Sequence, residues 1–138
     1  MECGRILALD YGAKNVGLAC CDELGVAVRP LPSLPNRGRR DLAGRLKDAV
    51  LEHGINRIVV GMPLNMDGSS GEAVRRVERF IAYLRSELAL PLEGMDERLS
   101  TTEAAEIWRK MSPRQQKRYR TVDSLAAARI LQRYLEES

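Results

Sequence analysis

The sequence predicts an α/β protein with a mixed five-stranded sheet and helices on both faces of that sheet. Three short apolar segments joined by tight turns come first, which indicates an antiparallel meander. Strand and helix patterns then alternate, as is typical of parallel βα units. The chain has 138 residues, so we expect a single domain over 1–138 with one core.

The meander is expected in residues 5–10, 16–21 and 26–34, with glycine-containing turns between the segments. The first segment is apolar and ends in an acid, Asp10. Three prolines fall in or beside the third segment: Pro30, Pro32 and Pro35. Because proline cannot donate to a neighbouring strand, the third strand should lie at an edge of the sheet or end early.

The second half of the chain alternates between helical and strand patterns. Residues 40–53 have helical apolar spacing, and Gly54 is a natural C-terminal cap. A short apolar strand at 58–61, plausibly parallel, should be covered on both faces. A helix over 72–88 and a final strand over 92–97 follow.

The C-terminal part is expected to be helical around one loop. Ser100 and Glu103 have the spacing of a capping box, which predicts the start of a helix. Residues 112–121 are polar and basic and are expected to form a loop. The last helix should run from about 123 to 135.

The composition excludes several classes of protein. Hydrophobic residues make up 44% and charged residues 30%, which is a globular composition. No apolar run is long enough to cross a bilayer, and no secretory signal pattern is present, so a cytoplasmic location is expected. Three cysteines (Cys3, Cys20 and Cys21) and one histidine (His53) make a disulfide framework or a zinc site a poor interpretation.

Basic residues form two clusters, although the net charge is only +3. The first cluster comprises Arg109, Lys110, Arg114, Lys117, Arg118 and Arg120. The second comprises Arg37, Arg39, Arg40, Arg45 and Lys47. Such clusters can contact phosphates, but a solvated surface explains either of them taken alone.

Three acids occupy positions from which carboxylates could meet. Asp10 ends the first strand, Glu97 ends the last, and Asp123 opens the final helix. The ends of parallel strands meet at one edge of an α/β sheet, where such folds place their sites. Neighbouring carboxylates repel one another, and Mg²⁺ or Mn²⁺ would relieve that cost. Metal ions held in this way can activate water for cleavage of a phosphodiester.

Each acid also has a simpler interpretation. Asp10 could make an Asx turn, Asp123 could serve only as a favourable helix N-terminal residue, and Glu97 could pair with Arg98. Asp96 is an alternative to Glu97, because adjacent residues of a strand point to opposite faces.

The loop over 61–71 is rich in Gly, Asn, Asp and Ser and leads into a helix. Backbone N–H groups at a helix N-terminus can receive a phosphate, so Asn65 and Ser69 are candidate substrate-binding residues. An ordinary capped loop is an equally good interpretation of this pattern.

Four segments together resemble the YqgF family, also called RuvX, whose members are RuvC-like proteins of the ribonuclease H superfamily. These segments are LALDYGAKNVGLA at 7–19, IVVGMPLNMDGSSG at 58–71, DERLST at 96–101 and DSLAAARILQRYL at 123–135. The resemblance spans nearly the whole chain and implies a ribonuclease H-like fold. It also implies a nuclease that processes the 5′ end of the small-subunit (16S) rRNA precursor or resolves Holliday junctions.

The resemblance assigns roles to particular residues. The family's metal-binding acids map onto Asp10, Glu97 and Asp123, and its substrate-facing loop maps onto 61–71. Lys14 stands where the family has a basic residue, whereas Asn15 replaces an arginine that the family often has next to it.

The leading hypothesis is a divalent-metal-dependent nuclease acting on structured RNA or branched DNA. The predicted substrate-binding residues are Lys14, Asn65, Ser69, Arg98, Arg114, Lys117 and Arg118. Association with the ribosomal small-subunit precursor is expected, and a homodimer would suit a two-fold symmetric junction. The alternatives are a non-catalytic RNA-binding ribosome assembly factor and an actin-like ATPase, which would need a second domain.

Overall fold

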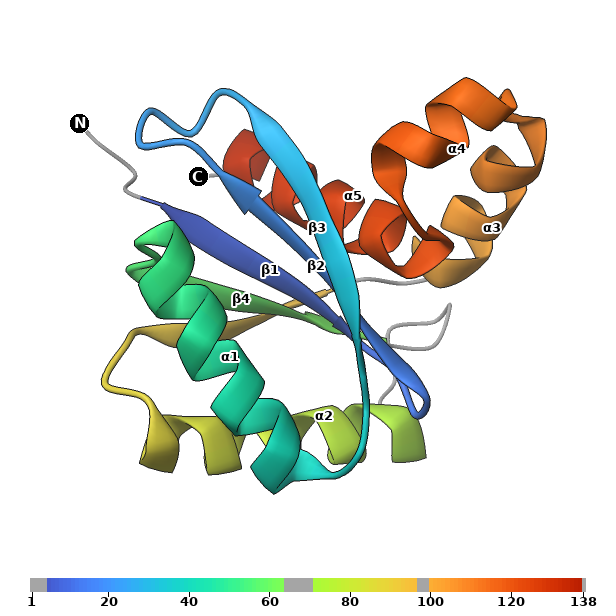
Figure 1. Ribbon diagram of the computed structural model, residues 1–138. Coiled ribbons are helices and arrows are strands. Elements are labelled where there is room, and N and C mark those ends of the chain that lie inside the picture. Colours follow the sequence, from blue (N-terminus) through green and yellow to red (C-terminus); the bar gives the residue numbers. More distant parts are fainter. Residues whose placement is uncertain (1–4, 64–70, 97–99, 138) are drawn as a thin grey trace.

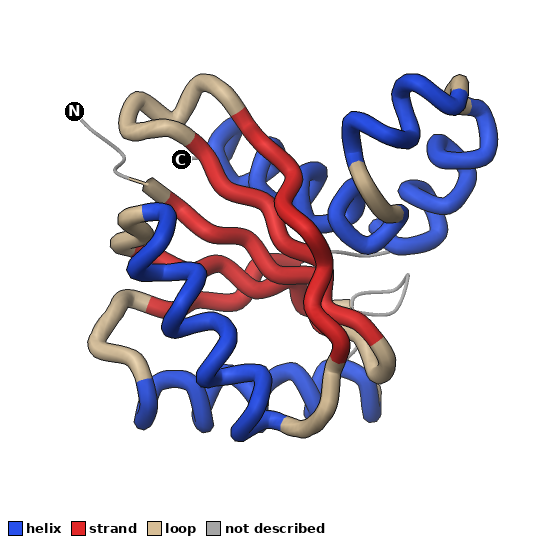
Figure 2. Tube along the Cα trace, viewed as in Figure 1, coloured by secondary structure: helices blue, strands red, loops and turns tan. Residues whose placement is uncertain are grey.

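The computed structural model of the protein describes residues 5–63, 71–96 and 100–137, with the backbone alone described from 100 to 103. Its sheet has five strands in the order β3-β2-β1-β4-β5 (Figure 2). The strands are β1 (Ile6–Tyr11), β2 (Asn15–Cys21), β3 (Val28–Pro35), β4 (Arg57–Met62) and β5 (Leu92–Asp96). The first three strands form the predicted antiparallel meander, and β1, β4 and β5 are parallel.

Helices cover both faces of this sheet (Figure 1). The helices are α1 (Arg39–His53), α2 (Glu72–Glu87), α3 (Ser100–Lys110), α4 (Pro113–Tyr119) and α5 (Val122–Glu137). α1 and α2 lie on one face and α5 lies on the other, while α3 and α4 pack beside the beginning of α5. Among the described helices, none combines the length and hydropathy that a membrane-spanning segment needs.

The two faces of the sheet are packed with side chains of different size. Leu7, Leu9 and Val60 point toward α1 and α2, where Leu and Phe side chains fill a thick core. The opposite face presents Ala8 and Ala19 to alanines of α5, so that helix lies close to the strands. Small side chains therefore fix the separation between α5 and the sheet.

Most of the predicted elements are present, and their limits have identifiable causes. The proline-containing β3 is an edge strand, as predicted. It begins at Val28 and not at 26, because the Asp22 carboxylate accepts a hydrogen bond from the Val26 N–H at 2.8 Å and holds that residue in a turn. α1 ends at His53, and the left-handed φ of 64° at Gly54 confirms the predicted cap.

One prediction is wrong: residues 112–121 contain a helix, α4, and are not simply a loop. The Ser112 side chain accepts a hydrogen bond from the Gln115 N–H at 3.2 Å, and Gln115 accepts one from the Ser112 N–H at 2.9 Å. This reciprocal capping box, followed by Pro113 at the first helical position, starts a helix in a segment without apolar periodicity. The predicted cap of α3, Ser100 with Glu103, involves side chains outside those described.

Candidate active site

The carboxylate of Asp10 lies at the end of β1 on the face covered by α5. Asp10 is opposite Gly17 in β2, and the preceding pair on the same face is Ala8 with Ala19. Asp10 thus continues the row of small residues on which α5 packs. Its carboxyl group stands where the sheet, the β1–β2 turn and the start of α5 meet.

Gly17 allows the N-terminus of α5 to reach this position. A Cβ atom at residue 17 would lie 1.9 Å from the backbone oxygen of Asp123 and 2.3 Å from its carbonyl carbon. Any other residue would therefore displace the first turn of α5 from β2. The pairing of β2 with β3 is also irregular at this point, between Val16 and Leu18, and such irregularities often re-aim strands next to functional sites.

Hydrogen bonds fix the first turn of α5 against the sheet. The Thr121 hydroxyl oxygen accepts a hydrogen bond from the Ser124 N–H at 3.0 Å, as an N-cap does. The fully buried Ser124 hydroxyl donates to the Leu31 carbonyl of β3 at 2.5 Å. Asp123, which lies between these two residues, is therefore held by both its helix and the edge strand.

Asp123 lies near Asp10, because its backbone packs against Gly17, which is opposite Asp10 in the sheet. Burial, and then the charge of Asp123, raise the pKa of Asp10 from 3.8 to about 6. Burial also raises the pKa of Asp123. Two carboxyl groups with raised pKa values share this place, and a divalent cation would stabilise their ionised forms.

The register of β5 with β4 shows on which face of the sheet Asp96 lies. Met95 packs in the cluster beneath α5, whereas Asp96 is opposite Met62, which contacts the core on the α1 and α2 side. Asp96 therefore points away from the Asp10 face. Glu97 and Arg98 lie outside the described residues, and within the described ranges no three acids, histidines or cysteines form a metal-binding group.

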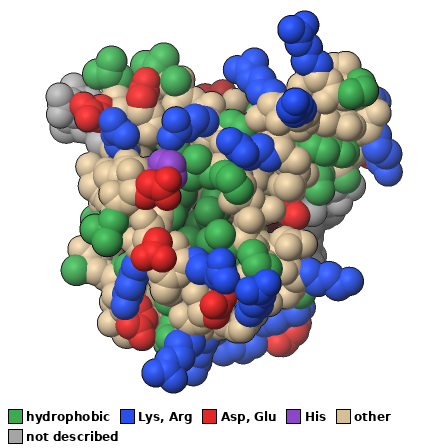
Figure 3. Space-filling view, in the orientation of Figure 1, with side chains coloured by type: hydrophobic (Ala, Val, Ile, Leu, Met, Phe, Trp, Pro, Cys, Tyr) green, Lys and Arg blue, Asp and Glu red, His purple; other side chains and the backbone are tan. Residues whose placement is uncertain are grey.

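The predicted phosphate contacts are placed at two locations. Lys14 is exposed in the β1–β2 turn, directly beyond Asp10. Arg114, Lys117 and Arg118 are exposed on α4, where Lys and Arg side chains gather at the upper right of Figure 3. Asn65 and Ser69 lie outside the described residues, so their predicted role is unchanged.

Sequence reasoning missed a strained residue close to Asp123. Arg120 has a φ of 71° and a ψ of −60°. The Thr121 N–H donates to the Tyr119 carbonyl at 2.8 Å, which makes a γ-turn centred on Arg120. This turn redirects the chain from α4 into α5. No sequence motif predicts this γ-turn, because arginine has no preference for a positive φ.

Comparison with known sequences identifies relatives of the whole chain. A family model described as "RuvX: Holliday junction resolvase" matches residues 4–137. A protein of Syntrophus aciditrophicus is 40% identical over 132 residues, covering 96% of this chain and 88% of that protein. A protein of Geobacillus kaustophilus is 41% identical over 134 residues, covering 96% and 97%. Both are named "Putative pre-16S rRNA nuclease".

Comparison with solved structures gives the fold. Thermus thermophilus RuvC in complex with a Holliday junction substrate matches with a TM-score of 0.59 at 10% identity, covering 96% of this chain and 94% of that chain. Fowlpox virus resolvase in complex with Holliday junction DNA matches with a TM-score of 0.58 at 12% identity, covering 96% and 97%. The predicted ribonuclease H-like fold is confirmed.

Proposed function

The chain belongs to the RuvX family, and from this membership we propose that it is a nuclease that hydrolyses phosphodiester bonds in nucleic acid. The observation that carries the proposal is the pair of carboxylates, Asp10 and Asp123, brought together at the end of β1. Two carboxylates that are buried close together repel each other, and a bound cation would offset this repulsion. Carboxyl groups with raised pKa values of this kind are frequent at functional sites.

The donor set fits a divalent metal. Asp10 and Asp123 offer hard oxygen ligands, and burial, followed by the charge of Asp123, raises the pKa of Asp10, a cost that a bound cation would offset. We propose that Asp10 and Asp123 hold Mg²⁺ or Mn²⁺, with Glu97 as a third ligand. Bound there, such an ion would supply an activated water and neutralise charge on the phosphate.

The protein's own residues position these acids and the substrate. Gly17 allows Asp123 to approach Asp10, and Ser124 ties the same helical turn to β3. Lys14 and the exposed basic residues of α4 (Arg114, Lys117 and Arg118) would bind the phosphate backbone on either side of the scissile bond. Asn65, Ser69 and Arg98 remain predicted contacts.

The proposed substrate is the 5′ region of the small-subunit rRNA precursor, as the names of the relatives suggest. Branched DNA is a second substrate of the same proposal, because RuvC and the fowlpox resolvase share the fold and bind Holliday junctions. Action in the cytoplasm, binding to the ribosomal precursor and homodimer formation remain predictions.

The test compares matched Asp-to-Asn variants on both substrates, a 5′-extended 16S rRNA fragment and a four-way DNA junction, with Mg²⁺ and with Mn²⁺. Asp10→Asn and Asp123→Asn should lose at least about a hundredfold in cleavage while retaining nucleic-acid binding. Asp48→Asn removes an exposed carboxylate from α1 and should cleave normally. Undiminished cleavage by Asp10→Asn would refute the assignment, and binding without cleavage by the unsubstituted chain would favour the assembly-factor alternative.

A further inference from the structure

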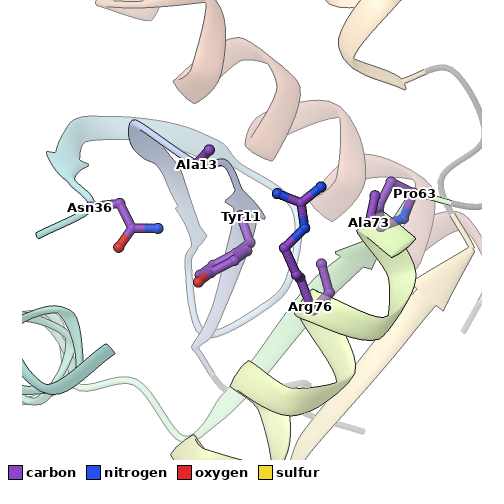
Figure 4. A pocket seen from close by; sticks show the side chains of 7 residues that line it. Tyr11, Ala13, Asn36, Pro63, Ala73 and Arg76 are labelled. Atoms are coloured by element: carbon purple, nitrogen blue, oxygen red, sulfur yellow. The ribbon is translucent and has the colours of Figure 1, made fainter. Parts of the chain in front are cut away.

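A concave surface lies at the strand end that carries Asp10, but on the opposite face of the sheet. This surface, which we call the Arg76 pocket, has a volume of about 410 Å³. Tyr11, Ala13 and Asn36 line one side, and Ala73 and Arg76 of α2 line the other (Figure 4). A smaller hollow of about 160 Å³ shares Tyr11 and Arg76 with it and adds other arginines, Arg39 and Arg79.

The charges around this pocket are unbalanced. Glu72 forms ion pairs with Arg75 at 3.5 Å and with Arg79 at 3.4 Å. Within the part of the chain that the structure describes, Arg76 forms no ion pair, and Arg39 makes only a cation–π contact, 4.7 Å from the centre of the Tyr83 ring. Among the residues that the structure describes, no acidic side chain lines either hollow. Two guanidinium groups are therefore available to an anion, and their planar geometry suits a phosphate.

The walls of the pocket are held in place before any ligand binds. The Tyr11 ring stacks on Phe80, with ring centres 4.4 Å apart and planes inclined by 26°. The Asn36 side-chain amide donates to the Gly12 carbonyl at 2.8 Å, which ties the end of β3 to the β1–β2 turn. In Figure 4 the Arg76 side chain extends from α2 past the Tyr11 ring. A preformed site of this kind loses little entropy on binding.

The position of the pocket relates it to the carboxylates. Tyr11 directly follows Asp10 in β1, so the two side chains point to opposite faces of the sheet at the same strand end. The β1–β2 turn, with exposed Lys14, separates the two faces. A nucleic acid strand whose scissile phosphate was held by a metal ion at Asp10 would cross this turn to bring another phosphate to Arg76.

We propose that the Arg76 pocket binds a backbone phosphate of the nucleic acid strand away from the scissile bond, with Arg76 as its main contact and Arg39 as its neighbour. This proposal rests on the nuclease function proposed above. It adds a binding position on the face of the sheet opposite the two acids. The nucleic acid strand would therefore pass around the β1–β2 turn.

The test measures equilibrium binding of a fluorescein-labelled single-stranded RNA, and of DNA of the same sequence, to the full chain carrying Asp10→Asn in EDTA. Adding Arg76→Ala should weaken binding about tenfold. It should also reduce the slope of log affinity against log salt concentration by about 0.7, the value for one lost phosphate contact. Arg39→Ala should also weaken binding and reduce this slope.

The matched control is Arg75→Ala, which removes the same charge from the adjacent position of α2 but from a side chain outside both hollows. Equal losses from Arg75→Ala and Arg76→Ala would overturn the proposal, because the effect would then be one of net charge. Inorganic phosphate serves as a second probe. If Arg76→Ala weakened only its binding and not that of RNA or DNA, the pocket would serve a free anion and the proposal would fail.

These outcomes separate this proposal from the proposed function. Undiminished cleavage by Asp10→Asn refutes the active-site assignment, whereas normal RNA and DNA binding by Arg76→Ala refutes only the pocket. A chain without Arg substitutions that bound neither nucleic acid would overturn both.

Discussion

Replacing Gly17 with alanine should move one of the two acids without removing it. The added Cβ would lie 1.9 Å from the Asp123 carbonyl oxygen, whereas ordinary contacts of a Cβ begin at 3.4 Å. The first turn of α5 must therefore retreat by about 1.5 Å from β2. Overpacking of this kind costs about 1–3 kcal/mol of stability.

The functional cost should exceed the cost in stability. A displacement of about 1 Å in a catalytic group reduces rates by about a hundredfold. Gly17→Ala should therefore cleave about a hundred times more slowly than the unsubstituted chain, while the chain stays folded and both carboxylates remain. Single-turnover cleavage with Mg²⁺, together with urea unfolding, measures the two effects separately.

Gly44→Ala is the control for this experiment. Gly44 lies inside α1, and a Cβ there would meet nothing within 4 Å. This variant should gain about 0.5–1 kcal/mol of stability, since alanine is the better helix former, and should cleave normally. A cleavage rate for Gly17→Ala within about threefold of the unsubstituted chain would refute the argument that backbone contact at Gly17 positions Asp123.

Three further predictions concern Asp10, Arg120 and Ser112. The folded state binds the Asp10 proton more tightly than the unfolded chain, so the free energy of unfolding without metal should fall by up to about 3 kcal/mol as the pH rises from about 4 to about 6. Asp10→Asn should remove this decrease, which urea unfolding in EDTA at several pH values measures. A decrease of equal size in that variant would contradict the raised pKa of Asp10. Arg120→Gly should raise the free energy of unfolding by about 1 kcal/mol because glycine tolerates a φ of 71°, whereas Arg120→Ala should bring no gain; equal effects would exclude strain. Ser112→Ala should cost α4 about 1 kcal/mol, seen as faster hydrogen exchange in α4 than in the sheet, and unchanged exchange would contradict the role of the capping box.

Features that depend on local sequence patterns could be predicted from the sequence alone. Apolar segments and proline positions predicted the meander and its edge strand, because both act through the backbone of a single strand. Asp10 and Asp123 were candidates because each stands at the end of a recognisable element, and their role as metal ligands stays a prediction. The helix over Pro113–Tyr119 was missed because its signal is a capping box and not a periodicity.

Features that depend on contacts between distant segments could not be predicted in the same way. In the sequence Gly17 is an ordinary glycine within a strand. Only the structure shows that the backbone of Asp123 packs against it. The face on which Asp96 lies depends on the register of β5 with β4, which no local pattern encodes. Arg76 and Arg39, which line the Arg76 pocket and the smaller hollow beside it, belong to separate helices, and only the fold places them beside Tyr11.

The unequal thickness of the two layers has a consequence for how this protein can change. On the α5 side, Ala8, Gly17 and Ala19 leave almost nothing between main chains, so the distance from helix to sheet is set by backbone atoms. On the other side, leucines and Phe80 form a deep layer in which one side chain can compensate for another. Substitutions there that conserve the total volume are therefore expected to leave Asp10 and Asp123 in the same relative position.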